Sequence, residues 1–114
     1  MALPQFIRAM VESKLGPYCE KKIPPHALDT VRLGFRFRGN SVTLFEERTA
    51  FMNPDTRVDI VVAQFRFDPR TSMWTLYCAD RNSRWHDYFD LMPSRNFEDL
   101  LLEVDKDPTG IFWG

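Results

Sequence analysis

Residues 33–47 read LGFRFRGNSVTLFEE and predict a β-hairpin together with its register. Gly39-Asn40 favours a two-residue turn, because both residues tolerate a positive φ angle. If Arg38 pairs with Ser41, three further cross-strand pairs are apolar or opposite in charge, as strand pairing favours. These pairs are Phe37 with Val42, Phe35 with Leu44 and Arg32 with Glu47. A slip of one residue would turn the phenylalanines to the other face.

An amphipathic helix is predicted before the hairpin, from Pro4 to about Lys22. Its apolar side chains recur at helical spacing, and they are Phe6, Ile7, Met10, Val11, Leu15 and Tyr18. Gly16-Pro17 interrupts the pattern, and we expect the helix to kink or restart there because proline lacks a backbone donor. Pro24-Pro25 ends the helix, and residues 23–31 connect it to the hairpin.

A second hairpin and a fifth strand are expected after a loop around residues 52–56. The hairpin has a strand from about Val58 to Phe67, a turn at residues 68–71 and a return strand from Ser72 to Ala79. The expected register places Phe67 opposite Ser72, Phe65 opposite Trp74, Ala63 opposite Leu76 and Val61 opposite Cys78. A turn at Arg81-Asn82 then lets residues 84–88 pair back, with Trp85 on the face of Cys78 and His86 beside Tyr77.

A second helix is expected from Phe97, with Asn96 as its N-cap and Pro108 as its stop. The ending Ile111-Phe-Trp-Gly114 is expected to dock on the sheet or helix, because a free apolar tail would be sticky. We therefore expect an α+β fold in a single domain, residues 1–114. It is a five-stranded antiparallel meander sheet with the N- and C-terminal helices packed on one face.

Composition narrows the classes of function. The formal net charge of −1 provides no overall basic field that would draw the chain onto nucleic acid or anionic membrane. No apolar run approaches the roughly 20 residues that span a bilayer, and the N-terminus lacks the features of a signal peptide. Two cysteines, Cys19 and Cys78, cannot form a disulfide framework. We expect a cytoplasmic protein with reduced thiols and no membrane partner.

Catalytic and metal-binding chemistry is not indicated. The residues available for a metal are Cys19, His26, Cys78 and His86, whose spacing includes no close chelating pair. His86 has the chemistry of a general base, but an edge-strand histidine beside tyrosine is more often structural. Nothing resembles a nucleophile elbow. We therefore expect no catalytic, cofactor-binding or metal-binding residues.

No short turn joins the second and third strands, so alternation alone does not align the faces of the two hairpins. If the faces align, one side of the sheet combines arginine with aromatic side chains: Arg36, Arg38, Phe45, Gln64, Arg66, Tyr77, His86 and Tyr88. The other face, expected under the helices, collects Phe35, Phe37, Val42, Leu44, Phe65, Trp74, Leu76 and Trp85. Residues 23–105 contain ten arginines and no lysine, which suits bidentate recognition of carboxylate or phosphate. A GC-rich genome would give the same bias. The alternative interpretation of the arginine face is an ordinary solvated sheet surface.

The candidate partner-binding residues are Arg36, Arg38, Arg66, Tyr77, His86 and Tyr88. The favoured function is a non-catalytic binding module that recognises a protein partner, as an adaptor, an inhibitor or a self-associating chain. The alternative is a nucleic-acid-binding module that stacks bases on the arginine–aromatic face. An enzyme of unknown class is the third possibility.

Several motifs together resemble one family. They are GFRFRGNSVTLFE at residues 34–46, WTLY at 74–77, RWHDY at 84–88, FEDLL at 97–101 and GIFWG at 110–114. The chain resembles the DUF3024 family of small bacterial proteins over nearly its whole length and in the same order. The resemblance implies a bacterial, single-domain protein with an uninterrupted first helix, from which Gly16-Pro17 departs. It assigns no activity, cofactor or catalytic residue.

Overall fold

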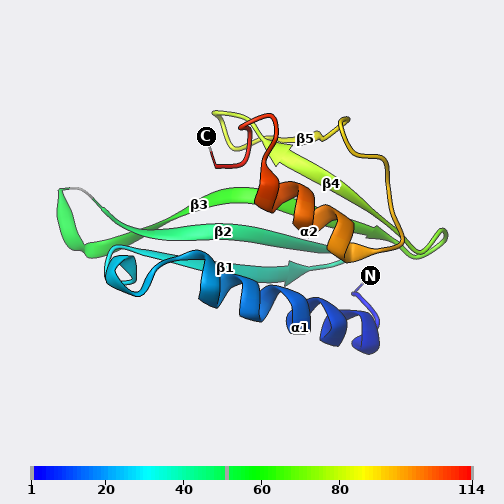
Figure 1. Cartoon of the computed structure of the whole chain (residues 1–114), viewed down its shortest axis with the longest axis horizontal. Coiled ribbons are helices and arrows are strands. Elements are labelled where there is room, and N and C mark those ends of the chain that lie inside the picture. The colour runs from blue at the N-terminus through cyan, green and yellow to red at the C-terminus, as the bar shows by residue number, and fades with distance from the viewer. Residues whose placement is uncertain (1, 51, 114) are drawn as a thin grey trace.

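A computed structural model describes residues 2–50 and 52–113 (Figure 1). Its elements are α1 (Gln5–Lys22), the 3-10 helix η1 (Pro25–Ala27), β1 (Val31–Arg38), β2 (Ser41–Ala50), β3 (Asn53–Asp68), β4 (Met73–Ala79), β5 (Trp85–Asp87) and α2 (Phe97–Lys106). The five strands form one antiparallel sheet in the order β1-β2-β3-β4-β5. The predicted α+β fold is confirmed.

Both helices lie on the same face of the sheet. The ring of Phe97 in α2 lies 4.8 Å from that of Phe65 and 5.0 Å from that of Trp74. From α1, the guanidinium of Arg8 lies 4.4 Å from the ring centroid of Phe37 on the same sheet face. The core beneath the helices includes Val11, Leu15, Val42, Leu44, Phe65, Trp74, Leu76, Tyr88, Phe97, Leu100 and Val104.

The predicted β1–β2 hairpin is confirmed in every pair. Arg38 lies opposite Ser41, Phe37 opposite Val42, Phe35 opposite Leu44 and Arg32 opposite Glu47. Gly39 adopts a φ of 57°, as the tight turn requires. The two-residue turn fixes the register, so the alternation of side chains along the strands determines which face of the sheet each side chain occupies.

Helix α1 runs without a break through Gly16 and Pro17, so the predicted restart is wrong. Val11 and Leu15 are buried before Pro17 and Cys19 is buried after it. A proline inside a helix costs about 3 kcal/mol, whereas burying one large apolar side chain contributes about 1.5–3 kcal/mol. Packing on both sides of the proline therefore outweighs the missing hydrogen bond.

The second hairpin forms with a different register from the one predicted. Phe67 lies opposite Trp74, Phe65 opposite Leu76 and Ala63 opposite Cys78, a shift of two residues. The loop holds four residues, since Ser72 at a φ of 57° donates its N–H to the carbonyl of Asp68 (2.8 Å). The Asp68 carboxylate also accepts from the Arg70 N–H (2.9 Å). Because the shift is even, the predicted faces of β3 and β4 survive at these positions.

The start of β3 also differs from the prediction. The loop expected around residues 52–56 is mostly strand, because β3 begins at Asn53, which lies opposite Ala50. Residue 51 lies outside the described part of the chain. A bulge between Leu44 and Phe45 adds one residue, Val62, to β3, and both Val62 and Ala63 are buried. Strict alternation from Ala63 would place Val62 on the opposite face, but the bulge turns it into the core.

Strand β5 is displaced by one residue from the predicted register. Ala79 lies opposite Trp85, Cys78 opposite His86 and Tyr77 opposite Asp87. The loop before β5 is organised by Asp80, whose carboxylate accepts from the N–H groups of Asn82 (2.8 Å) and Arg84 (3.0 Å). An odd shift exchanges the faces. The predicted sides of Trp85, His86 and Tyr88 are therefore wrong.

Helix α2 begins and ends as predicted. The Asn96 side chain accepts from the Glu98 N–H (3.1 Å), so Asn96 is the N-cap. Asp107, at a φ of 45°, ends the helix directly before Pro108. Its carboxylate then accepts from the N–H groups of Phe112 (3.1 Å) and Trp113 (2.8 Å), which turns the tail back onto the helix.

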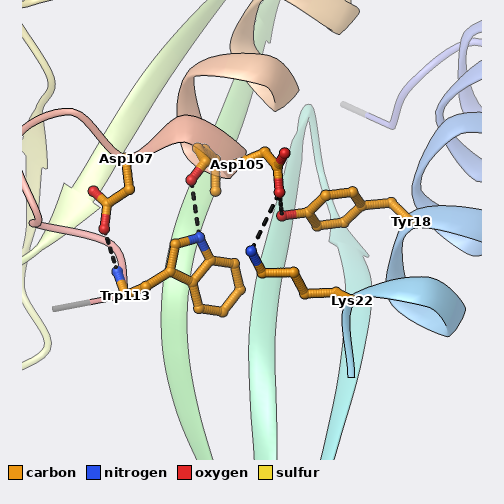
Figure 2. Close-up of polar contacts among 6 residues, drawn as sticks. Tyr18, Lys22, Asp105, Asp107 and Trp113 are labelled. Carbon is orange, nitrogen blue, oxygen red and sulfur yellow. Dashed lines mark hydrogen bonds and ion pairs between the residues drawn. The ribbon is translucent and has the colours of Figure 1, made fainter. Parts of the chain in front are cut away.

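The docked tail joins the two helices (Figure 2). Trp113 donates its indole N–H to the carbonyl of Val104 (2.9 Å), and Lys22 lies 4.9 Å from the Trp113 ring centroid. Lys22 and the Tyr18 hydroxyl both reach Asp105, at 3.2 and 3.0 Å. Burial, then the hydrogen bond to Asp105, raises the pKa of Tyr18. Docking of the tail is thus confirmed through Trp113, and Gly114 lies outside the described residues.

Candidate functional site

The face of the sheet turned away from the helices carries three arginines from two strands. The register places Arg36 and Arg38 of β1 with Thr43 and Phe45 of β2, and Gln64 and Arg66 of β3 beside them. Tyr77 of β4 lies opposite Gln64. We call this set, together with Trp85, the arginine–aromatic face. The sequence predicted the arginines, Phe45, Gln64 and Tyr77 on this face, and that placement is confirmed.

Arg66 is held in one position by its neighbours. Its guanidinium carbon lies 3.7 Å from the ring centroid of Tyr77, and its Nε donates to Oε1 of Gln64 (2.6 Å). The Gln64 amide in turn donates to the hydroxyl of Thr43, a buried residue (3.0 Å). Stacking and hydrogen bonding fix the plane of the guanidinium, which leaves its outer N–H groups free to bind a planar anion.

Arg36 is occupied within the chain. Its guanidinium lies 4.8 Å from the ring centroid of Phe45 and forms an ion pair with Asp59 at 3.3 Å. The Phe45 ring reaches this place because Gly34 lies opposite it. A Cβ atom at Gly34 would stand 3.0 Å from that ring. The glycine therefore lets an aromatic ring lie flat over β1.

Arg38 and Arg66 carry charges that no carboxylate of the described residues neutralises. Within the described residues, neither forms an ion pair with a carboxylate. Asp87 shares the face opposite Tyr77, but it makes no ion pair with Arg66 in that part of the chain. Two guanidiniums of the same face therefore remain available for an outside anion.

Trp85 completes the face, although the sequence pattern predicted it on the opposite side. It lines a hollow of about 520 Å³ together with Arg38, Asn40, Ser41, Gln64, Arg66 and Phe67. A second hollow of about 350 Å³ is lined by Arg36, Phe37, Arg38, Thr43, Val61, Gln64 and Trp85. Because these linings combine β1 with β5, the two edge strands of the sheet, this face is concave.

His86 and Tyr88 do not belong to this face. Tyr88 is 4% exposed and lies opposite Leu76, to whose carbonyl it donates its N–H (2.9 Å). Its hydroxyl donates to Glu103 (2.8 Å), and burial raises the pKa of Tyr88. His86 is exposed at the edge, where its Nε2 lies 2.7 Å from a carboxylate oxygen of Asp80. The six predicted partner-binding residues are therefore divided, with four on one face.

The reactive side chains of the molecule lie apart from this face. Burial raises the pKa of Cys19 to about 11 and also raises the pKa of Cys78, so both thiols are protonated at neutral pH. Within residues 2–50 and 52–113, no three His, Cys, Asp or Glu side chains are grouped as metal ligands. The arginine–aromatic face itself presents guanidinium donors beside aromatic rings.

The fold and this face define a small α+β protein whose antiparallel sheet is covered by helices on one side and presents arginine and aromatic side chains on the other. The family described as domain of unknown function (DUF3024) matches residues 3–114, and the chain belongs to it. No match was found among curated proteins or among solved structures. Of the helices that the structure describes, none has the length and apolarity to cross a membrane.

Proposed function

We propose that this chain is a non-catalytic binding module of the bacterial cytoplasm, which recognises an acidic segment of a protein partner through the arginine–aromatic face. The observation that carries the proposal is the pair of guanidiniums, Arg38 and Arg66, which no carboxylate of the described residues neutralises. They lie in the same hollow as Trp85. Arginine, tryptophan and tyrosine are the residues that most often anchor protein interfaces.

The number of free charges favours a peptide over a nucleic acid. Nucleic-acid binders commonly contact about six to ten phosphates, and their affinity falls steeply with salt. Two free guanidiniums would give a slope of only about −1.4 for single strands. The formal net charge of −1 also provides no overall attraction. A peptide carboxylate needs only one well-placed arginine, which it can engage by two parallel hydrogen bonds.

The test is a titration of labelled peptides against the full chain. One peptide alternates glutamate with tyrosine, and its control alternates glutamine with tyrosine. We expect the acidic peptide to bind and the neutral one to bind at least about tenfold more weakly, as the loss of a charged hydrogen bond predicts. Arg66→Ala and Arg38→Ala should each weaken binding of the acidic peptide. Arg70→Ala, at an exposed loop arginine, is the matched control and should change nothing.

A single-stranded nucleic acid is the second candidate, because bases also stack on tyrosine, tryptophan and arginine. The same titration with an oligothymidine of matched length separates the two. The chain would be a nucleic-acid-binding module if it bound the oligonucleotide more tightly than the acidic peptide. In that case Arg66→Ala should abolish the binding and leave the fold intact. Binding of neither probe would refute recognition of anions by this face.

A further inference from the structure

The half of β3 near the hairpin tip has a neighbouring strand on one side only. Residues 57–61 pair with β2, whereas pairing with β4 begins at Ala63. Among the described residues, the edge of β3 from Asn53 to Val61 therefore faces no strand. Figure 1 shows β2 and β3 continuing together well beyond the end of β4. An exposed edge of this kind presents unpaired backbone groups to another chain.

The side chains along this edge are partly apolar. Val58 is 45% exposed and Ile60 is 46% exposed, and both lie on the helix side of the sheet beyond the cover of the helices. On the other face, Arg57 and Asp59 alternate with them. Each charge has an internal partner, since Arg57 lies 3.5 Å from Glu47 and Asp59 lies 3.3 Å from Arg36.

We propose that this edge of β3 pairs with the same edge of a second copy of the chain. The strands run antiparallel about a two-fold axis at Val58. In this register Arg57 lies opposite Asp59 of the second copy, Asp59 lies opposite Arg57 of the second copy, and the two Val58 side chains meet. Each ionic pair forms twice by symmetry, and Ile60 lies diagonally beside the apolar pair, within reach of it.

The charges select this register against its neighbours. A shift of two residues in one direction places Asp59 opposite Asp59, and in the other direction it places Arg57 opposite Arg57. Like charges directly opposite one another destabilise a strand pair. Charged edge residues usually prevent pairing, but here their alternation is self-complementary.

The length of the contact predicts a weak dimer. Regular pairing of β2 with β3 ends at Thr49 and Arg57, where the register shifts. The intermolecular ladder is therefore short, and interfaces of small area are typical of weak, reversible association. Dimerisation should depend on protein concentration and should weaken as salt screens the exposed charges.

The test exchanges the two charges. Arg57→Asp leaves two acidic residues at positions 57 and 59, and Asp59→Arg leaves two arginines there, so each variant alone should have a dissociation constant at least about tenfold above that of the unaltered chain. An equal mixture should dimerise again, because each acidic residue then faces an arginine. Sedimentation velocity over a range of concentrations measures the association of each variant and of their mixture. Arg70→Asp, at a distant loop, controls for net charge and should leave association unchanged.

Circular dichroism checks that each variant is folded. If a charge reversal unfolds the chain, Arg57→Gln and Asp59→Asn replace it, with an expected weakening of about threefold. The proposal is overturned if the unaltered chain stays monomeric at every concentration. It is equally overturned if the mixture of folded, oppositely charged variants stays monomeric, or if Arg70→Asp weakens association as much as Arg57→Asp.

Discussion

The two faces of the sheet are built from the same strands but hold their aromatic rings in different ways. On the helix side, Phe65, Trp74 and Phe97 are buried against one another, with ring centroids about 5 Å apart. On the other side, the rings of Phe45 and Tyr77 lie under guanidiniums. The buried face is stabilised by exclusion of water, whereas the open face orders its side chains by stacking and hydrogen bonds. The first face therefore carries the stability of the fold, and the second is free to bind.

The largest effect should come from truncating the buried rings. Phe65→Ala and Trp74→Ala should each lower the free energy of unfolding by about 3–5 kcal/mol, because each leaves a cavity in the core. Phe35→Ala should have a smaller effect, since Phe35 is only half-buried. Urea denaturation followed by circular dichroism measures these differences.

The matched change on the open face is Arg66→Ala, which should alter the free energy of unfolding by less than about 0.5 kcal/mol. An arginine substitution as harmful as the loss of Trp74 would show that the open face also carries the fold. The contrast between the two faces would then fail.

A second, somewhat smaller effect should follow deletion of residues 111–114. This deletion removes Phe112, which is 7% exposed and lies 5.1 Å from the Tyr88 ring, together with the indole that Lys22 covers. We expect unfolding to be easier by roughly 3 kcal/mol and the truncated chain to aggregate. Thermal denaturation and light scattering measure the two effects. An unchanged melting temperature and a monodisperse solution would contradict the docking of the tail.

The third effect separates two tyrosines that the sequence pattern placed on one face. Tyr88→Phe should lower the free energy of unfolding by about 1.5 kcal/mol, because it removes a hydrogen bond to the charged Glu103 in a buried setting. Tyr77→Phe should leave stability unchanged within about 0.5 kcal/mol. Tyr77→Ala should weaken binding of the acidic peptide, whereas Tyr88→Phe should leave that binding unchanged. If Tyr88→Phe and Tyr77→Phe changed the free energy of unfolding equally, the assignment of a buried, bonded hydroxyl to Tyr88 alone would be contradicted.

The smallest effect concerns the loop that orients β5. The hydrogen bond from His86, with those from the backbone of Arg84 and Asn82, holds the pKa of Asp80 below its usual value. A carboxyl with a lowered folded pKa stabilises the loop above its unfolded pKa of about 3.9. That contribution is lost as the pH falls through the folded pKa. Amide chemical shifts of Asn82 and Arg84 should therefore move at acid pH, ahead of global unfolding, and Asp80→Ala should abolish this step.

How much of the molecule could be predicted from its sequence depended on the turns. The Gly39-Asn40 turn has two residues, so the faces of β1 and β2 followed from alternation alone. The loops after Asp68 and Ala79 are closed by aspartate side chains and by serines at positive φ. A loop of this kind can be one or two residues longer or shorter while the hydrophobic pattern of the flanking strands stays the same. The pattern alone therefore does not fix the register. The face of Arg38 followed from the two-residue turn. Arg66 and Tyr77 kept their predicted face because the shift of their hairpin was even, whereas Trp85 and Tyr88 changed face because the shift of β5 was odd.

One signal for the true β5 register was present in the chain. Asp80 stands two residues before Asn82 and four before Arg84, a spacing at which an aspartate closes a loop onto backbone N–H groups. The continuity of α1 through Pro17 had no such local signal. It depends on Leu15 and Cys19 contacting a core built by distant strands.

The anchoring of Tyr88 has a consequence for Trp85, three residues earlier. Tyr88 is fixed by its N–H bond to Leu76, by its hydroxyl bond to Glu103 and by the Phe112 ring. Together with the Asp80 loop, it clamps β5 at both ends. The backbone that carries the Trp85 ring is thus already ordered before any ligand arrives. For the binding function proposed above, less conformational entropy would be lost on association, and the contact made by this ring would appear more fully as affinity.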